Sequence, residues 1–333
     1  DVASAVAELM EGERPEHFGD IHRTYEDGER MVTTPPYTAF LKIAEGCSNG
    51  CAFCIIPKLR GRYRSRSMEA LVEEARGLAA SGVKELIVIA QDITRYGLDR
   101  KDGSTLAKLL DRLCELDFHW IRLHYLYPEA VTDELIETIA RQPKILHYLD
   151  IPIQHCNDAI LKAMRRRNTR VEIEALFAKL RKAMPDVVLR TSLICGLPGE
   201  VKAEFEDLFE FLREARIERA GIFQFSPEEG TPAAEMGDQV DAATAERRVE
   251  LVVDLQSRIM DEYNEERLGT VMEVLCEGFD SAEGCYTGRT YADSPDIDGR
   301  VLFTAAGVIP AGTFVHVRIT GMADGDLTGG IEG

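Results

Sequence analysis

The run Cys47-Ser48-Asn49-Gly50-Cys51-Ala52-Phe53-Cys54 places three thiols on one short stretch, directly after a strand-like run at residues 37–44. Thiolates this close on one loop can converge on one metal centre, and cysteine is the usual ligand of iron–sulfur clusters. A zinc ribbon would need a fourth ligand nearby, and no Cys or His follows the cysteine run before Cys114. Three ligands leave one iron of a four-iron cluster open, so the spacing favours a catalytic cluster over zinc, a disulfide or structural thiols.

Around this loop the chain alternates between strand-like and helix-like runs. Six apolar runs have the length of buried strands, at residues 40–44, 85–90, 120–126, 145–153, 187–194 and 221–225. Helical patterns fill the intervals, at residues 68–80, 105–116, 133–141, 159–165, 173–184 and 203–215. The alternation predicts an α/β fold with a parallel sheet of right-handed βαβ units, either open or closed into a barrel. In both forms reactive groups gather at the carboxyl ends of the strands, where the cysteine loop lies.

The regions before and after this alternating part have different sequence patterns. Residues 1–36 begin with a helical pattern and continue in Pro, Gly and charge, which is typical of the end of a preceding domain plus a linker. The start at Asp1 inside that pattern favours a fragment of a longer chain. After the α/β region, residues 37–240, we expect a connecting helix at 241–267. Residues 268–333 show short strand-like runs at 271–277, 285–291, 299–303 and 313–319, which predict a small all-β barrel or sandwich.

The charge of the chain is acidic and uneven. The 333 residues carry a formal net charge of -19, the last lysine is Lys202, and the part from Arg267 onward holds ten Asp or Glu against four Arg. The electric field of this negative charge repels phosphate backbones and favours a basic partner, although an acidic surface can also serve solubility alone. No apolar run approaches the roughly 20 residues that cross a bilayer, and no signal-peptide pattern is seen, so we expect a cytoplasmic protein that does not cross membranes.

The cysteine loop resembles a known family signature. Its order Cys-x3-Cys-x2-Cys, with aromatic Phe53 before the last cysteine, is similar to the motif of the radical S-adenosylmethionine (SAM) superfamily. Residues 43–47, 55–57 and 60–66 narrow the resemblance to the methylthiotransferases. The resemblance implies a partial (β/α)6 barrel and, at residues 268–333, a TRAM domain. It also implies a [4Fe–4S] cluster, with one open iron that binds SAM, on the ligands Cys47, Cys51 and Cys54.

Further candidates follow later strands. Gln91 and Asp92 suit either a cofactor contact or an ordinary polar turn, and the resemblance places this position beside the cofactor. The pattern Gln-Asp-x-Thr-x-Tyr from Gln91 resembles the branch that modifies a ribosomal protein, called RimO, more than the tRNA-modifying branch, called MiaB. The element Pro-x-Gln-His at residues 152–155 and the runs 190–200 and 225–232 also resemble family segments. The cofactor contacts implied in this way are Phe53, Gln91, Asp92, Gln154, Arg190, Gly196, Glu200 and Phe225.

The remaining notable residues have plainer interpretations. A lone His155 or Cys156 is more often structural than a ligand. The other scattered thiols are most simply small buried hydrophobic groups. The basic loop at residues 58–66 suits either screening of an anionic cluster or a solvated surface, and the sequence leaves both open.

The resemblance implies a reaction and its partners. Members of the RimO branch add a methylthio group to the β-carbon of an aspartate in ribosomal protein twelve of the small subunit. One SAM molecule is cleaved to a 5′-deoxyadenosyl radical, and a second supplies the methyl group. The implied partners are that basic protein, free or in the ribosome, and an electron donor of the flavodoxin or ferredoxin type. The alternative is a MiaB-like tRNA adenosine methylthiotransferase, although the acidic tail makes tRNA an unfavourable partner.

One departure from the family pattern concerns a second cluster. Complete methylthiotransferases carry an N-terminal domain with three further cysteines that bind a second [4Fe–4S] cluster, implicated in supplying sulfur. No cysteine precedes Cys47 in this chain. The second cluster is therefore expected only in an upstream domain that this chain lacks.

Overall fold

A computed structural model describes residues 2–17, 19–21 and 31–332. Its main body is an open sheet of six parallel strands in the order β1-β4-β5-β6-β7-β8, so each strand lies beside its successor in the chain. The predicted α/β fold with a partial barrel is confirmed. The six strands are β1 (Thr38–Lys42), β4 (Glu85–Ile89), β5 (Trp120–Leu123), β6 (Ile145–Asp150), β7 (Val188–Cys195) and β8 (Arg219–Gln224).

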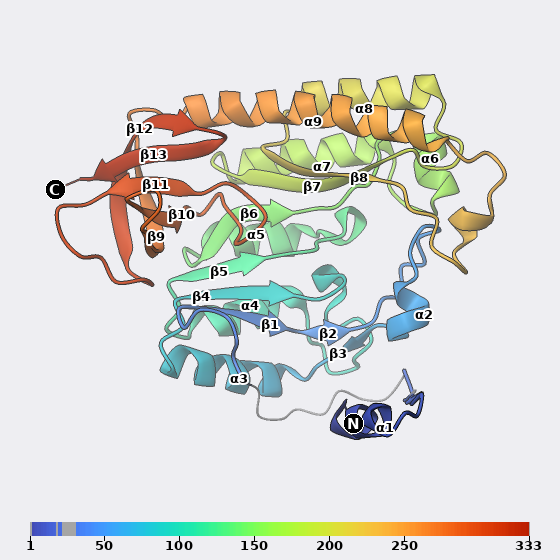
Figure 1. The fold of residues 1–333 in the computed structure, drawn as a ribbon, viewed down its shortest axis with the longest axis horizontal. Helices are drawn as coiled ribbons and strands as arrows, with labels where there is room; N and C mark the ends of the chain where they lie inside the picture. Colours follow the sequence, from blue (N-terminus) through green and yellow to red (C-terminus); the bar gives the residue numbers. More distant parts are fainter. Residues whose placement is uncertain (1, 18, 22–30, 333) are drawn as a thin grey trace.

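Helices connect these strands and cover the outer face of the sheet (Figure 1). They are α3 (Met68–Ala80), α4 (Leu106–Cys114), α5 (Asp133–Arg141), α6 (Asp158–Ala163), α7 (Arg170–Ala183) and α8 (Lys202–Ala215). The start of α3 shows why the sequence predicts such boundaries well. The hydroxyl of Ser67 accepts a hydrogen bond from Ala70 N at 3.1 Å, which satisfies one of the free amides of the first turn.

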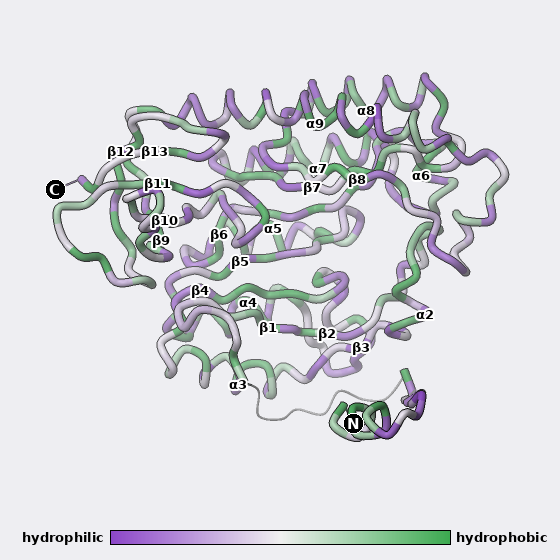
Figure 2. Tube along the Cα trace, in the orientation of Figure 1, coloured by the Kyte–Doolittle hydropathy of each residue, from purple (hydrophilic) through white to green (hydrophobic). Residues whose placement is uncertain are grey.

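The main core lies between the sheet and this helical layer. Strand β4 contributes Leu86, Ile87 and Val88, none of which is exposed, because a parallel strand is covered on both faces. The long helix α9 (Ala242–Glu265) packs beside α8 and returns along the sheet edge (Figure 1). In Figure 2, α9 alternates between hydrophobic and hydrophilic residues, as expected for a helix with one buried side.

The C-terminal region forms a separate closed barrel in the order β10-β11-β13-β12-β9. Its strands are β9 (Val271–Asp280), β10 (Cys285–Arg289), β11 (Val301–Thr304), β12 (Phe314–Ala323) and β13 (Asp326–Ile331). Strand β13 was not predicted, because Gly329 and Gly330 interrupt its apolar pattern. Glycine suits this strand sterically, since a Cβ on Gly329 would lie 2.2 Å from the carbonyl oxygen of Arg318 on the neighbouring strand.

The small barrel packs against the amino ends of the sheet strands, at the end opposite the cysteine loop (Figure 1). Trp120 at the start of β5 meets Phe314 of β12 with 4.7 Å between ring centres. Beside this apolar contact, the buried carboxylate of Glu85 accepts hydrogen bonds from Arg122 Nε at 2.8 Å and from Arg289 Nη2 at 2.6 Å. A charge network therefore joins the two domains inside their interface.

The N-terminal helix α1 (Val2–Met10) agrees with the helical pattern at the start of the chain, and none of its residues is buried. The predicted linker in residues 1–36 includes residues 22–30, which lie outside the described part. Across the described ranges, no helix has both the length and the apolar character that a membrane crossing requires.

Candidate functional site

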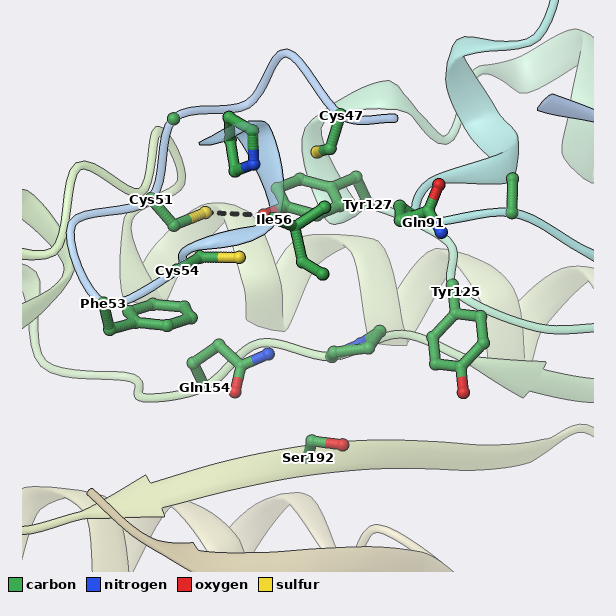
Figure 3. Close-up of a pocket in the computed structure, with 14 residues that line it drawn as sticks. Cys47, Cys51, Phe53, Cys54, Ile56, Gln91, Tyr125, Tyr127, Gln154 and Ser192 are labelled. Carbon is green, nitrogen blue, oxygen red and sulfur yellow. Dashed lines mark hydrogen bonds between the residues drawn. The ribbon is translucent and has the colours of Figure 1, made fainter. Parts of the chain in front are cut away.

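A cavity of about 370 Å³ opens at the carboxyl ends of the strands. The side chains of the three cysteines at positions 47, 51 and 54 point into it, with Gln91, Gln154 and Ser192 on its other walls (Figure 3). Gln91 and Gln154 follow β4 and β6, and Ser192 lies in the second half of β7, so the carboxyl-terminal parts of several strands contribute to one space. This is where α/β sheets of this topology hold their ligands.

The cysteine loop is held at both of its ends. A two-stranded ribbon, β2 (Ala44–Glu45) with β3 (Arg64–Ser65), closes its base. Gly46 has φ of +76°, and a Cβ there would lie 2.3 Å from the carbonyl oxygen of Arg62, so only glycine fits this turn. On the far side, Ala52 N donates to Met164 O at 3.0 Å. The loop is therefore fixed against α6 as well as against its own ribbon.

The three thiols fit an iron–sulfur cluster better than a single ion. Burial raises the pKa of both Cys47 and Cys54, so their thiolates need a nearby positive charge. Within the described residues, no three His, Cys, Asp or Glu side chains are grouped closely enough to hold one metal ion. A cubane instead bonds its cysteines through separate irons, which suits thiols spaced around a cavity.

Gln91 and Asp92, adjacent in sequence, play different parts. Gln91 lines the cavity, and in the part of the chain that the structure describes its buried Oε1 has no hydrogen-bond partner. Asp92 is fully buried and does not line the cavity. Its carboxylate accepts from Asn49 Nδ2 at 2.8 Å and from Thr94 N at 3.0 Å. Asp92 therefore ties the cysteine loop to the end of β4 by holding Asn49, and Gln91 is the side chain that presents a free acceptor to the cavity.

Gln154 lies between the cysteine cavity and a second cavity of about 270 Å³. Phe53 and Ser192 also border both, and Phe225 lines the second. Gln154 has φ of +71°, which is costly for a residue with a Cβ. Two backbone hydrogen bonds with β7 hold it there, from Gln154 N to Ser192 O at 2.9 Å and from Ile194 N to Gln154 O at 2.8 Å.

Three of the predicted contacts lie away from both cavities. Arg190 belongs to the inner part of β7 and donates to Asp150 Oδ1 at 2.8 Å. Glu200 is buried and accepts from Gly196 N at 3.1 Å and from Arg248 Nη1 at 2.8 Å, which closes the turn after β7. Gly196 has φ of +81°, and a Cβ there would lie 2.5 Å from the Cβ of an α9 alanine, so this glycine allows α9 to approach. In this structure all three maintain the fold around the site.

The basic loop lies beside the cavity but is only partly free. Arg66 is buried and forms an ion pair with Glu74 at 2.7 Å, and Lys58 donates to the carbonyl oxygen of Gly230. Arg60 and Arg62 are exposed next to the short helix α2 (Ile56–Arg60). The loop thus divides its charges between holding the fold and facing solvent.

Two tyrosines and one arginine were not among the predicted site residues. Tyr125 and Tyr127 follow β5 and line the cavity, and Tyr127 Oη lies 2.7 Å from Cys51 Sγ. Arg166 lies behind Tyr127, with its guanidinium carbon 4.1 Å from the ring centre. Their position directly after a predicted strand is a signal for the tyrosines. No sequence pattern points to Arg166.

Comparison with known proteins agrees with this arrangement. The model of the radical SAM superfamily matches residues 41–212, and that of the TRAM domain matches residues 268–331. Coproporphyrinogen III oxidase (HemN) from Escherichia coli, a radical SAM enzyme, has a similar fold with a TM-score of 0.50 at 13% identity, over 78% of this chain and 68% of that chain.

Proteins that are related in sequence identify the family more narrowly than the fold does. The ribosomal protein uS12 methylthiotransferase RimO of Caldanaerobacter subterraneus is 46% identical over 98% of this chain and 75% of that protein. The RimO protein of Pelobacter propionicus is 50% identical over 91% of this chain and 68% of that protein. The chain belongs to the RimO family of radical SAM methylthiotransferases.

Proposed function

We propose that the chain transfers a methylthio group to ribosomal protein uS12, at the β-carbon of an aspartate. The observation that carries this proposal is the convergence of three cysteine side chains on one cavity, in a chain 44–50% identical to RimO relatives. When bound, a [4Fe–4S] cluster and SAM supply a carbon radical that can take hydrogen from an unactivated C–H bond. No side-chain base of the protein could remove that hydrogen as a proton at neutral pH.

The residues of the cavity divide into ligands and cofactor contacts. Cys47, Cys51 and Cys54 are the proposed cluster ligands. Gln91 Oε1, which has no hydrogen-bond partner among the described residues, is the proposed acceptor for the methionine ammonium group of SAM. Since an unpaired buried acceptor costs free energy, this atom favours a ligand that donates to it.

The second cavity extends this site toward the adenosine part of SAM. We assign Phe53 and Phe225 as its apolar walls and Gln154 as a polar contact between the two cavities. The strained backbone of Gln154 supports a binding role, since strain of this kind accumulates at ligand sites.

The remaining proposals concern the setting of the reaction. We divide the chain into a linker at 1–36, a radical SAM domain at 37–240, a connecting helix at 241–267 and a TRAM domain at 268–333. A cytoplasmic flavodoxin or ferredoxin would supply the electron.

Sulfur insertion would need the second cluster, which the family carries upstream, and no cysteine of this chain precedes Cys47. We therefore expect 5′-deoxyadenosine but little methylthiolated product from this chain alone.

The test uses the chain reconstituted anaerobically with iron and sulfide, then given SAM and dithionite. We expect 5′-deoxyadenosine, and its loss together with the brown colour when any one ligand cysteine is replaced by alanine. With the upstream cluster domain added, mass spectrometry of uS12 should find one aspartate carrying the methylthio group, and a uS12 variant lacking that aspartate is the control. Modification of tRNA in place of uS12 would contradict the proposed substrate.

A further inference from the structure

Two side chains approach the sulfur of Cys51 from the wall of the cavity. The hydroxyl of Tyr127 lies 2.7 Å from Cys51 Sγ (Figure 3). The guanidinium group of Arg166 stacks on the Tyr127 ring and places Nη1 3.9 Å from the same sulfur. A hydroxyl donor and a positive charge therefore meet at one thiol.

The three cysteines differ in how their sulfurs are held. Cys47 and Cys54 each receive a backbone hydrogen bond from the residue two positions further on, Asn49 and Ile56. Cys51 differs in having two side chains from other parts of the fold at its sulfur, those of Tyr127 and Arg166.

The position of Arg166 is firmly determined. Only 7% of its surface is exposed, and its Nη2 donates to Pro152 O at 2.7 Å. In so buried a place a guanidinium group acts more strongly on a neighbouring sulfur than it would in water, because screening is weak. The stack also fixes the ring of Tyr127, so the hydroxyl keeps its direction toward Cys51.

We propose that Tyr127 and Arg166 are positioning residues that raise the reduction potential of the cluster through Cys51. The inference rests on the proposed cluster site. A thiolate bound to iron carries no proton, so Tyr127 must be the donor in its contact with Cys51. A donor and a positive charge at a ligand sulfur stabilise the state with one more electron, and hydrogen bonds to sulfur are among the groups that set such potentials. The pair makes the cluster easier for its electron donor to reduce.

The experiment is a dithionite titration of the reconstituted chain with redox mediators, followed by electron paramagnetic resonance. In Tyr127→Phe we expect the equilibrium constant for reduction to fall about tenfold, which corresponds to about 59 mV for a one-electron couple. Tyr125→Phe is the matched control, because this tyrosine lines the same cavity but its ring points away from the cysteines (Figure 3). Its potential should equal that of the unaltered chain.

A second variant tests the arginine. Arg166→Gln removes both the positive charge near Cys51 and the planar group that stacks on the Tyr127 ring, so its potential should also fall. Iron and sulfide contents are measured in every variant.

The outcomes separate this inference from the proposed function. An unchanged potential in either variant overturns the inference. So does loss of the cluster in Tyr127→Phe, which would make the tyrosine a requirement for cluster binding. A failure of the unaltered chain to hold any cluster would instead overturn the proposed function.

Discussion

Replacing Arg289 by methionine tests the charge network that joins the two domains. The guanidinium of Arg289 donates to Glu85 Oε2 at 2.6 Å, to Glu277 Oε1 at 2.7 Å and to the carbonyl oxygen of Asp293 at 3.2 Å. Neither Arg289 nor Glu85 is more than 2% exposed. The substitution leaves a buried carboxylate with fewer partners, so we expect a loss of unfolding free energy.

The structure also gives the size of the effect. Removing one partner of a buried ion pair costs about 3–5 kcal/mol. Arg122 Nε still faces Glu85 at 2.8 Å after the substitution, so the expected cost is near the lower end, about 3 kcal/mol. The control is Arg300→Met in the same domain, whose ion pair with Asp326 is partly exposed and should contribute less than about 1 kcal/mol.

The assay is urea unfolding followed by tryptophan fluorescence. Trp120 is the chain's one tryptophan and packs on Phe314 of the small barrel, so its emission reports directly on the interface. The midpoint should fall clearly in Arg289→Met and hardly at all in Arg300→Met, with similar slopes. Equal losses in the two variants would show that the buried network contributes no more than a surface pair, and would refute the reasoning.

Three further predictions concern acid stability, packing and cofactor affinity. Burial alone raises the pKa of Glu85, but Arg122 and Arg289 lower it to about 2 from 4.5, so this carboxylate stabilises the fold above pH 4.5. That contribution, on the order of 3 kcal/mol, should disappear as pH falls from about 5 toward 2, and Glu85→Gln should flatten the acid limb of a pH titration of stability. Gly196→Ala should cost about 1–3 kcal/mol in urea unfolding, because the new Cβ meets α9, whereas Gly77→Ala inside α3 meets nothing within 4 Å and should stabilise. Gln91→Leu should weaken SAM binding to the reconstituted chain about tenfold by equilibrium dialysis, and an unchanged affinity would remove Gln91 from the site.

The sequence predicts the elements of the fold better than the contacts of the site. Helices at 68–80 and 133–141 have the predicted bounds, because the apolar period and the capping residues act locally. The ribbon of β2 and β3 was missed, since two-residue strands carry no periodicity.

Side-chain direction explains the differences at the site. Gln91 and Asp92 are neighbours just after β4, yet only Gln91 faces the cavity, because the Asp92 carboxylate is engaged by Asn49 and by the backbone amide of Thr94. Arg190 lies several residues before the end of β7 and is engaged by Asp150 inside the sheet. Arg166 reaches Cys51 only through the packing of α6 against the loop, which no local pattern encodes.

The acidity of residues 268–333 has a different meaning once the fold is known. Asp293 pairs with Arg219 at 3.0 Å, and Asp298 lies 3.7 Å from Arg190, so some of the negative charge is neutralised by arginines of the sheet. The net charge of this segment in the sequence therefore overstates the field at its surface. Separating the small barrel from the sheet would expose both carboxylates. The isolated domain would then repel phosphate more strongly than the same domain does in the intact chain. A salt titration against uS12 and tRNA consequently has to use the intact chain, where steeper salt dependence with the basic protein would identify the surface charge as a binding determinant.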